Sequence, residues 1–134
     1  MREILFRGKQ EYKNKEWVFG NLHCEYGETD KNGQRKIDYR ILGMRGECDY
    51  VLSETVGQFT GLTDKNGKRI FEGDIAKNEY EDRNYQYFKI FYNEKTLRWE
   101  VMNKYGMRGN LHNVIGNMEV IGNIHDNPEL LENP

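Results

Sequence analysis

The stretch Val56–Ile75 constrains the fold more than any other part of the chain. It places the pair Asn66-Gly67 between two apolar runs and ends in Glu72-Gly73-Asp74. Asn-Gly is the preferred central pair of a type I′ turn, which joins two antiparallel strands. Gly73 marks a second tight turn at the entry to the next strand. Turns spaced this closely predict short antiparallel strands rather than long helices.

The tetrapeptide Asp-Lys-Asn-Gly occurs twice, at Asp30–Gly33 and at Asp64–Gly67. The match extends over Thr29–Arg35 and Thr63–Arg69, which differ only at Gln34 and Lys68. Outside these segments the two sequences are not similar. A true repeat would carry its apolar pattern across the whole period. We therefore predict two independent type I′ hairpin turns.

The rest of the chain shows the same β pattern, in which short apolar runs are followed by Gly, Asn or Asp. Pro128 before Glu129-Leu130-Leu131, with Asp126 or Asn127 as the cap, predicts one short helix. The sequence predicts a mainly β protein with strands at Ile4–Arg7, Trp17–Leu22, Ile37–Leu42, Asp49–Leu52, Val56–Thr60, Arg69–Phe71, Asp74–Asn78, Tyr85–Tyr92, Leu97–Asn103, Leu111–Ile115 and Glu119–Ile124.

A boundary is predicted near Ser53–Thr55. Residues 1–55 would form an N-terminal β layer, and residues 56–134 a second domain that ends in the short helix. Between Gln58 and Ile124 we expect a barrel-like unit of about five or six strands. Nothing near the boundary resembles a flexible linker, so the two parts are expected to pack together.

Composition excludes several classes of protein. The net charge is −2, whereas domains that bind duplex nucleic acid are usually strongly basic. No apolar run approaches the roughly 18 residues of a membrane span, and the N-terminus has no signal-peptide core. We expect a cytoplasmic protein with no membrane partner, in which Cys24 and Cys48 are reduced.

Two groups of titratable residues are candidates for chemistry. Glu72 and Asp74, if on one strand face, could hold a magnesium ion, and His112 or His125 could supply acid–base groups. Gly73 favours a tight turn over a site, and the Asp that follows His125 is better explained as a helix cap. The histidines lack the spacing of a metal pair. The sequence predicts no catalytic, cofactor-binding or metal-binding residues, and hence a protein that is not an enzyme.

The run Tyr85–Tyr92 is aromatic on both faces of its predicted strand, whereas a sheet with one solvated face should alternate apolar and polar residues. This pattern indicates either burial on both sides or an exposed aromatic strip. An exposed strip would serve as a subunit interface or as a platform for stacking bases. Phe88, Ile90 and Tyr92 are expected to share one face, and Tyr85, Tyr87 and Phe91 to lie on or near the other.

We favour a core strand whose outer side chains, Tyr85, Tyr87 and Phe91, form an oligomer interface, because nearby carboxylates would repel phosphates. The alternative is a module that binds single-stranded nucleic acid. Its contacts would be Lys65, Lys68 and Arg69 at the hairpin tip, with Tyr85, Tyr87 and Lys89 on the aromatic strand.

These residues resemble those of a known family. The block Val56–Ile75 resembles the central signature of the YopX family of phage and prophage proteins. Arg2–Lys9 and Trp17–Leu22 are similar to that family's N-terminal strands, and Ile115–Leu131 to its closing strand and helix. The likeness covers nearly the whole chain in order, and Ala76 stands where the family usually has valine.

The resemblance implies a mainly β protein with a C-terminal SH3-like barrel. It also implies homo-oligomeric assembly, with a hexamer as one candidate, and a phage or prophage gene expressed in a bacterial cytoplasm. It supplies no catalytic residues. The predicted function is that of an accessory protein of unknown biochemical activity that self-assembles and binds a phage or host protein.

Overall fold

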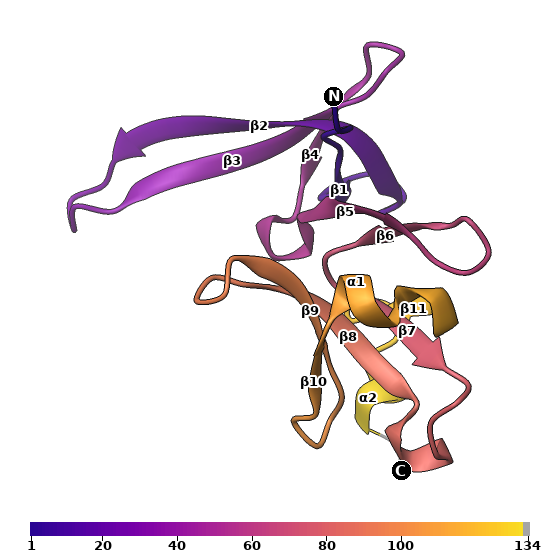
Figure 1. Cartoon of the computed structure of the whole chain (residues 1–134). Coiled ribbons are helices and arrows are strands. Elements are labelled where there is room, and N and C mark those ends of the chain that lie inside the picture. The colour runs from indigo at the N-terminus through magenta and orange to yellow at the C-terminus, as the bar shows by residue number, and fades with distance from the viewer. Residues whose placement is uncertain (133–134) are drawn as a thin grey trace. The chain divides into compact units, whose positions relative to one another are not determined.

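Residues 1–132, which the computed structural model describes, form a mainly β structure, as predicted (Figure 1). The chain divides into two compact units, Met1–Gln58 and a second unit that begins at Phe59. The division falls within strand β5 (Gly57–Thr63). The first residues of β5 pair with the first unit, and its later residues pair within the second.

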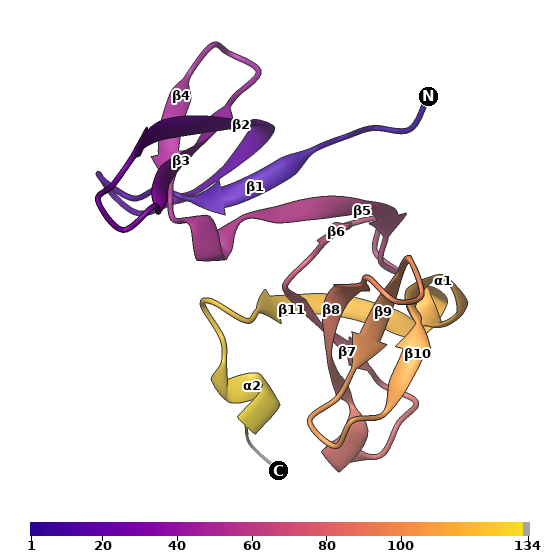
Figure 2. The ribbon, with the colours of Figure 1, turned by 90° about the vertical axis from the view of Figure 1, so that its left-hand side faces the viewer.

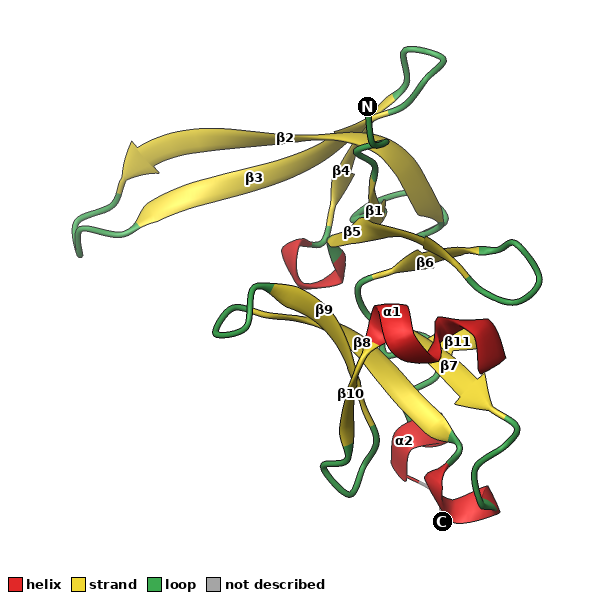
Figure 3. Ribbon diagram, in the orientation of Figure 1, coloured by secondary structure: helices red, strands yellow, loops and turns green. Residues whose placement is uncertain are grey.

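The first unit is an antiparallel sheet with the strand order β4-β3-β2-β1 (Figure 3). Strand β2 is much longer than predicted, because the alternation of apolar and polar residues continues past Leu22. Beyond the part that pairs with β1, the β2–β3 hairpin extends as a long arm (Figure 1). The elements are β1 (Phe6–Lys9), β2 (Trp17–Thr29), β3 (Arg35–Leu42), β4 (Cys48–Val51) and the short helix η1 (Ser53–Thr55).

The second unit contains a five-stranded antiparallel sheet with the order β10-β9-β8-β7-β11, beside the pair of β5 with β6 (Figure 2). The predicted C-terminal helix is confirmed as α2. The elements are β6 (Arg69–Phe71), β7 (Asp74–Asn78), η2 (Arg83–Tyr85), β8 (Tyr87–Asn93), β9 (Arg98–Met102), β10 (Arg108–Asn110), α1 (Leu111–Val114), η3 (Ile115–Asn117), β11 (Met118–Asn123) and α2 (Glu129–Glu132).

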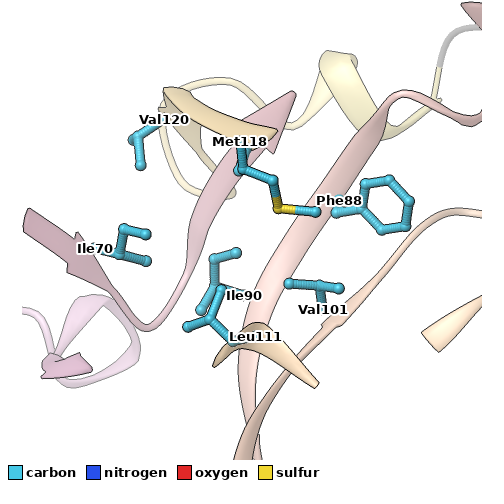
Figure 4. Close-up of a cluster of buried hydrophobic side chains, with 8 residues drawn as sticks. Ile70, Phe88, Ile90, Val101, Leu111, Met118 and Val120 are labelled. Carbon is cyan, nitrogen blue, oxygen red and sulfur yellow. The ribbon is translucent and has the colours of Figure 1, made fainter. Parts of the chain in front are cut away.

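One face of the five-stranded sheet forms the core of the second unit (Figure 4). Phe88 and Ile90 of β8 point into this core, as the alternation of the aromatic run predicted. Burying side chains of this size contributes about 1.5–3 kcal/mol each. The cluster consists of Ile70, Ala76, Phe88, Ile90, Val101, Leu111, Met118 and Val120.

The SH3-like barrel is not confirmed, because the sheet stays open. Strands β10 and β11 form its two edges and do not pair with each other in the described part of the chain. The predicted strand Leu111–Ile115 is wrong: after β10 the chain enters α1, capped by the Asn110 side chain, which accepts a bond from His112 N at 3.1 Å. The apolar residues Leu111, Val114 and Ile115 follow helical spacing, which explains the helix.

The Asp64 turn also differs from the prediction. Gly67 has φ +81°, but Asn66 does not have a positive φ, so the turn is not type I′. Gly67 N–H donates to the Asp64 carbonyl at 2.9 Å, and Asp64 Oδ1 accepts from Asn66 N and Lys68 N, also at 2.9 Å. This is a type I turn followed by a glycine bulge, held by its own carboxylate.

The second Asp-Lys-Asn-Gly copy makes the same turn. Gly33 N–H donates to the Asp30 carbonyl at 3.0 Å, and Asp30 Oδ1 accepts from Asn32 N at 2.8 Å and Gln34 N at 2.9 Å. The predicted pair of independent hairpin turns is therefore present, with a turn type set by the aspartate rather than by Asn-Gly alone.

The two turns differ in their second carboxylate oxygen. Asp64 is buried, and its Oδ2 accepts from Val120 N at 2.9 Å, which ties the turn to β11. Burial opposes ionisation of Asp64, but the bonds from Val120, Lys68 and Asn66 outweigh it and hold the pKa of this carboxyl below its usual value. Asp30 is exposed.

Glu100 on β9 stabilises the β8–β9 turn by accepting hydrogen bonds from side chains, as Asp64 accepts them from the backbone of its own turn. Its buried carboxylate accepts from Asn93 Nδ2 at 2.9 Å, Arg98 Nε at 2.7 Å and Thr96 Oγ1 at 2.9 Å. The Asn93 amide and the Arg98 guanidinium, with help from Thr96 and against the effect of burial, lower the pKa of Glu100 from 4.5 to about 2.

We expect Asp64→Ala to lower the free energy of unfolding by about 2–4 kcal/mol, because it leaves the buried Val120 N–H without an acceptor and removes two turn bonds. Urea denaturation measures this loss. Asp30→Ala is the matched control, since the same turn bonds are lost at an exposed site, and its effect should stay below about 1 kcal/mol. Equal losses in the two variants would contradict the role assigned to the Val120 bond.

The lowered pKa of Glu100 predicts acid sensitivity. Since the folded pKa lies below the unfolded value of 4.5, its stabilising effect is present above that pH and is lost as pH falls toward about 2. Glu100→Gln cannot titrate, so it should be less stable than the parent at neutral pH and lose less stability between about pH 5 and pH 2. Thermal unfolding across this pH range tests the expectation, which parallel curves would refute.

Candidate functional site

The carboxylates Glu72 and Asp74 belong to a turn, as the glycine between them indicated. Gly73 has φ +88°, and the buried Asp74 accepts a bond from Phe71 N at 2.7 Å through Oδ2. Glu72 is half-buried, and this burial raises its pKa. The two side chains therefore do not share the face of one strand, as a magnesium site there would require.

The histidines and cysteines lie on separate elements. His112 is exposed on α1, and His125 is half-buried in the turn after β11, where its N–H donates to Asn123 Oδ1 at 3.0 Å. Cys24 and Cys48 are free thiols. Within residues 1–132, no three His, Cys, Asp or Glu side chains gather in a group that could hold a metal ion.

The aromatic run is only partly a strand. Strand β8 begins at Tyr87, so Tyr85 lies in η2 and its predicted place on the strand is wrong. The Tyr85 ring instead packs against Tyr105, with ring centroids 5.1 Å apart. Tyr87 and Phe91 lie on the face opposite Phe88 and are half-buried. The predicted interface trio of Tyr85, Tyr87 and Phe91 is thus divided between two elements.

Cationic side chains surround the aromatic rings on this second face of the sheet. Lys89 Nζ and the Arg108 guanidinium lie 6.0 Å and 5.9 Å from the centroid of Phe91, and Lys104 Nζ lies 5.1 Å from that of Tyr105. We call these five residues the basic aromatic face. Glu100 is also on this side of β9, but its carboxylate forms an ion pair with the Arg98 guanidinium. The face therefore presents positive charge next to π-systems.

Of the predicted contacts at the hairpin tip, Lys65 and Lys68 lie on the β5–β6 connection and Arg69 is the first residue of β6. Lys65 Nζ is 3.3 Å from the Glu79 carboxylate, which offsets its charge. The Arg69 guanidinium lies 5.7 Å from the centroid of the Phe59 ring. Lys68 is exposed. Sequence reasoning thus combined residues from two different elements into one nucleic-acid surface.

Sequence reasoning missed an apolar stripe on the β2–β3 arm. Three cross-strand pairs put apolar side chains on one side of this hairpin, while His23, Glu25 and Arg40 occupy the other. Tyr26 and Ile37, near the tip, are 63% and 38% exposed. The signal was the alternation that runs from residue 22 to residue 26. The stripe pairs are Leu22 with Ile41, Cys24 with Tyr39, and Tyr26 with Ile37.

The arm also presents unpaired strand edges. Strand β1 pairs with β2 only over Trp17–Gly20, and β4 pairs with β3 only over Tyr39–Leu42. Among the described residues of this unit, Ile41 and Val51 are the hydrophobic side chains that are buried. A two-stranded hairpin is only marginally stable in water, and exposed edges are ready to pair with another chain.

No helix in residues 1–132 has the length and apolar character needed to cross a membrane. Among curated proteins, none matches the chain. A solved structure that is similar to it is that of protein EF1440 from Enterococcus faecalis, with 26% sequence identity and a TM-score of 0.55. The match covers 98% of this chain and 99% of that one.

The family comparison covers the same extent. A model of the YopX protein family matches residues 5–132, which include β1 through α2. The matched region takes in the Asp64 turn, the Gly73 turn and the closing segment whose residues carried the resemblance. The chain therefore belongs to the YopX family.

Proposed function

We propose that this chain is a phage or prophage accessory protein that acts in the bacterial cytoplasm by assembling with copies of itself and binding a phage or host protein. The observation that carries the proposal is the β2–β3 arm, whose apolar stripe is exposed at Tyr26 and Ile37 and whose outer edges are unpaired among the described residues. Covering such a stripe with a second copy removes apolar surface from water and pairs free backbone groups.

Assembly through the arm is favoured by the composition of the first unit. Ile41 and Val51 supply little buried apolar area for its 58 residues, and units of this size with small cores commonly rely on oligomerisation. A symmetric pair of arms would lay Tyr26 and Ile37 of one copy against the stripe of the other. Ring-shaped assembly, including a hexamer, is compatible with head-to-tail use of the two different edges.

A non-catalytic role is part of the same proposal. The carboxylates most suited to chemistry, Asp64, Asp74 and Glu100, accept bonds that hold turns in place. These structural roles account for their burial and for the lowered pKa values of Asp64 and Glu100 without a substrate.

We expect the double variant Tyr26→Ser/Ile37→Ser to shift the protein to monomers, because it removes the exposed end of the stripe. Light scattering coupled to size exclusion measures the mass. His23→Ser, on the polar side of the same arm, is the matched control and should keep the parent mass. A parent protein that is monomeric at high concentration, or a double variant that keeps the parent mass, would contradict assembly through the arm.

A second candidate function is the binding of single-stranded nucleic acid by the basic aromatic face. The specific observation is the set of cations over Phe91 and Tyr105. Bases stack on aromatic rings, and lysine or arginine beside the rings attracts the phosphates. Tyr87 and Lys89, which the sequence predicted as contacts, lie on this side of β8.

For this candidate we expect Tyr105→Ala to weaken binding of a fluorescent single-stranded oligonucleotide by about 5- to 150-fold, because stacking contributes roughly 1–3 kcal/mol per base. Tyr80→Ala, at an exposed tyrosine elsewhere in the unit, should leave the affinity unchanged. Affinity should also fall steeply as salt is raised. Fluorescence anisotropy measures both effects, and no binding at low salt would eliminate the candidate.

A further inference from the structure

A surface pocket of about 310 Å³ lies in the second unit, between the β9–β10 turn and α2. Its volume is at the lower end of the range for small-molecule sites. It adjoins the basic aromatic face, because Lys89 and Met102 are direct cross-strand partners on β8 and β9. The pocket is lined by Lys89, Met102, Asn103, Lys104, Gly106 and Leu131.

The turn that forms one wall of this pocket has the geometry of the Asp64 turn. Asn103 Oδ1 accepts from Tyr105 N and Met107 N, each at 3.0 Å, and Gly106 N–H donates to the Asn103 carbonyl at 3.1 Å. These two accepted bonds identify Oδ1 as the amide oxygen. The atom in the place of the second Asp64 oxygen is therefore a nitrogen that donates.

This nitrogen has no acceptor within the described chain. Asn103 is 4% exposed, and its Nδ2 is buried with no hydrogen-bond partner among residues 1–132. A buried donor left unpaired destabilises the folded state, so such groups are uncommon in folded proteins. In the equivalent turn the second atom of Asp64 is bonded to Val120. Asn103, which lines the pocket, thus keeps a buried donor unsatisfied by residues 1–132 at a position where an aspartate would also have built the turn.

Two lysines, Lys89 and Lys104, line the pocket together with Asn103. Lys89 makes no ion pair with any residue in 1–132, and its Nζ lies over the Phe91 ring. Lys104 lines the same pocket. The acidic residue on this side of β9, Glu100, is bonded to Arg98. Hydrogen bonds between charged donors and oxyanions are stronger than neutral ones, so the lining favours a negatively charged acceptor.

We infer that this pocket binds a small organic oxyanion, in which a carboxylate or phosphate is attached to a short apolar body. The oxyanion would accept from Asn103 Nδ2 and be balanced by the Lys89 ammonium, while Met102 and Leu131 contact the apolar body. Because Nδ2 is enclosed, binding requires a neighbouring lining side chain to move aside. This site is separate from the β2–β3 arm and does not depend on self-assembly.

The test follows the Asn103 side-chain amide by NMR in the full-length, ¹⁵N-labelled protein during titration with four probes. Hexanoate and hexyl phosphate should shift this resonance saturably. Acetate and inorganic phosphate should bind at least about tenfold more weakly, because they lack the apolar body that Met102 and Leu131 would remove from water. Preference for one hexyl ligand distinguishes a carboxylate from a phosphate site. If neither hexyl ligand moves the resonance, the inference is wrong.

Three variants complete the test. Asn103→Asp keeps the acceptor for the turn, as Asp30 and Asp64 demonstrate, but replaces the donor with a negative oxygen, so binding followed by calorimetry should be lost. Lys89→Gln should weaken binding by at least about tenfold. Lys95→Gln, at an exposed lysine in the β8–β9 turn, is the control and should bind like the parent. Unchanged binding in Asn103→Asp, or equal losses in the two lysine variants, would overturn the site.

Discussion

The structure depends on one recurring interaction, in which a side-chain oxygen at the start of a turn accepts backbone N–H groups two and four residues later. It occurs at Asp30, Asp64 and Asn103. These turns join β2 to β3, β5 to β6 and β9 to β10. Because the turn fixes the register of an antiparallel hairpin, each of these short bonds determines which side chains face the core and which face solvent.

The remaining side-chain atom distinguishes the three turns. Asp30 is exposed, the second oxygen of Asp64 accepts from Val120 N, and the second atom of Asn103 is a buried donor with no partner among residues 1–132. The same turn therefore lies on the surface at Asp30, forms a tertiary hydrogen bond at Asp64 and lines a pocket at Asn103. The physical reason is that Oδ1 accepts only from backbone N–H groups of its own turn. The other terminal atom of the side chain is therefore available to residues that pack against the turn.

The two candidate surfaces arise from the same alternation of side chains across strands. In the second unit, Phe88 and Ile90 fill the core, and Lys89 and Phe91 are left on the opposite face. On the β2–β3 arm, alternation collects apolar side chains on one side, where those near the tip, Tyr26 and Ile37, remain exposed. The first surface offers charge and π-systems, and the second offers apolar area and free strand edges, so they suit different kinds of partner.

The sequence by itself determined the mainly β class, the hairpin positions, the turn at Gly73, the core face of β8 and the C-terminal helix, because each depends on local spacing. Tertiary structure decided the rest. Leu111–Val114 form a helix instead of the predicted strand, and Tyr85 lies in η2 instead of β8. The five-stranded sheet is open instead of closed into a barrel. The burial of Asp64, and the absence of a partner for Asn103 Nδ2 within residues 1–132, depend on which distant residues pack beside them. Side-chain periodicity is local, whereas burial and hydrogen-bond satisfaction are set by neighbours far along the chain.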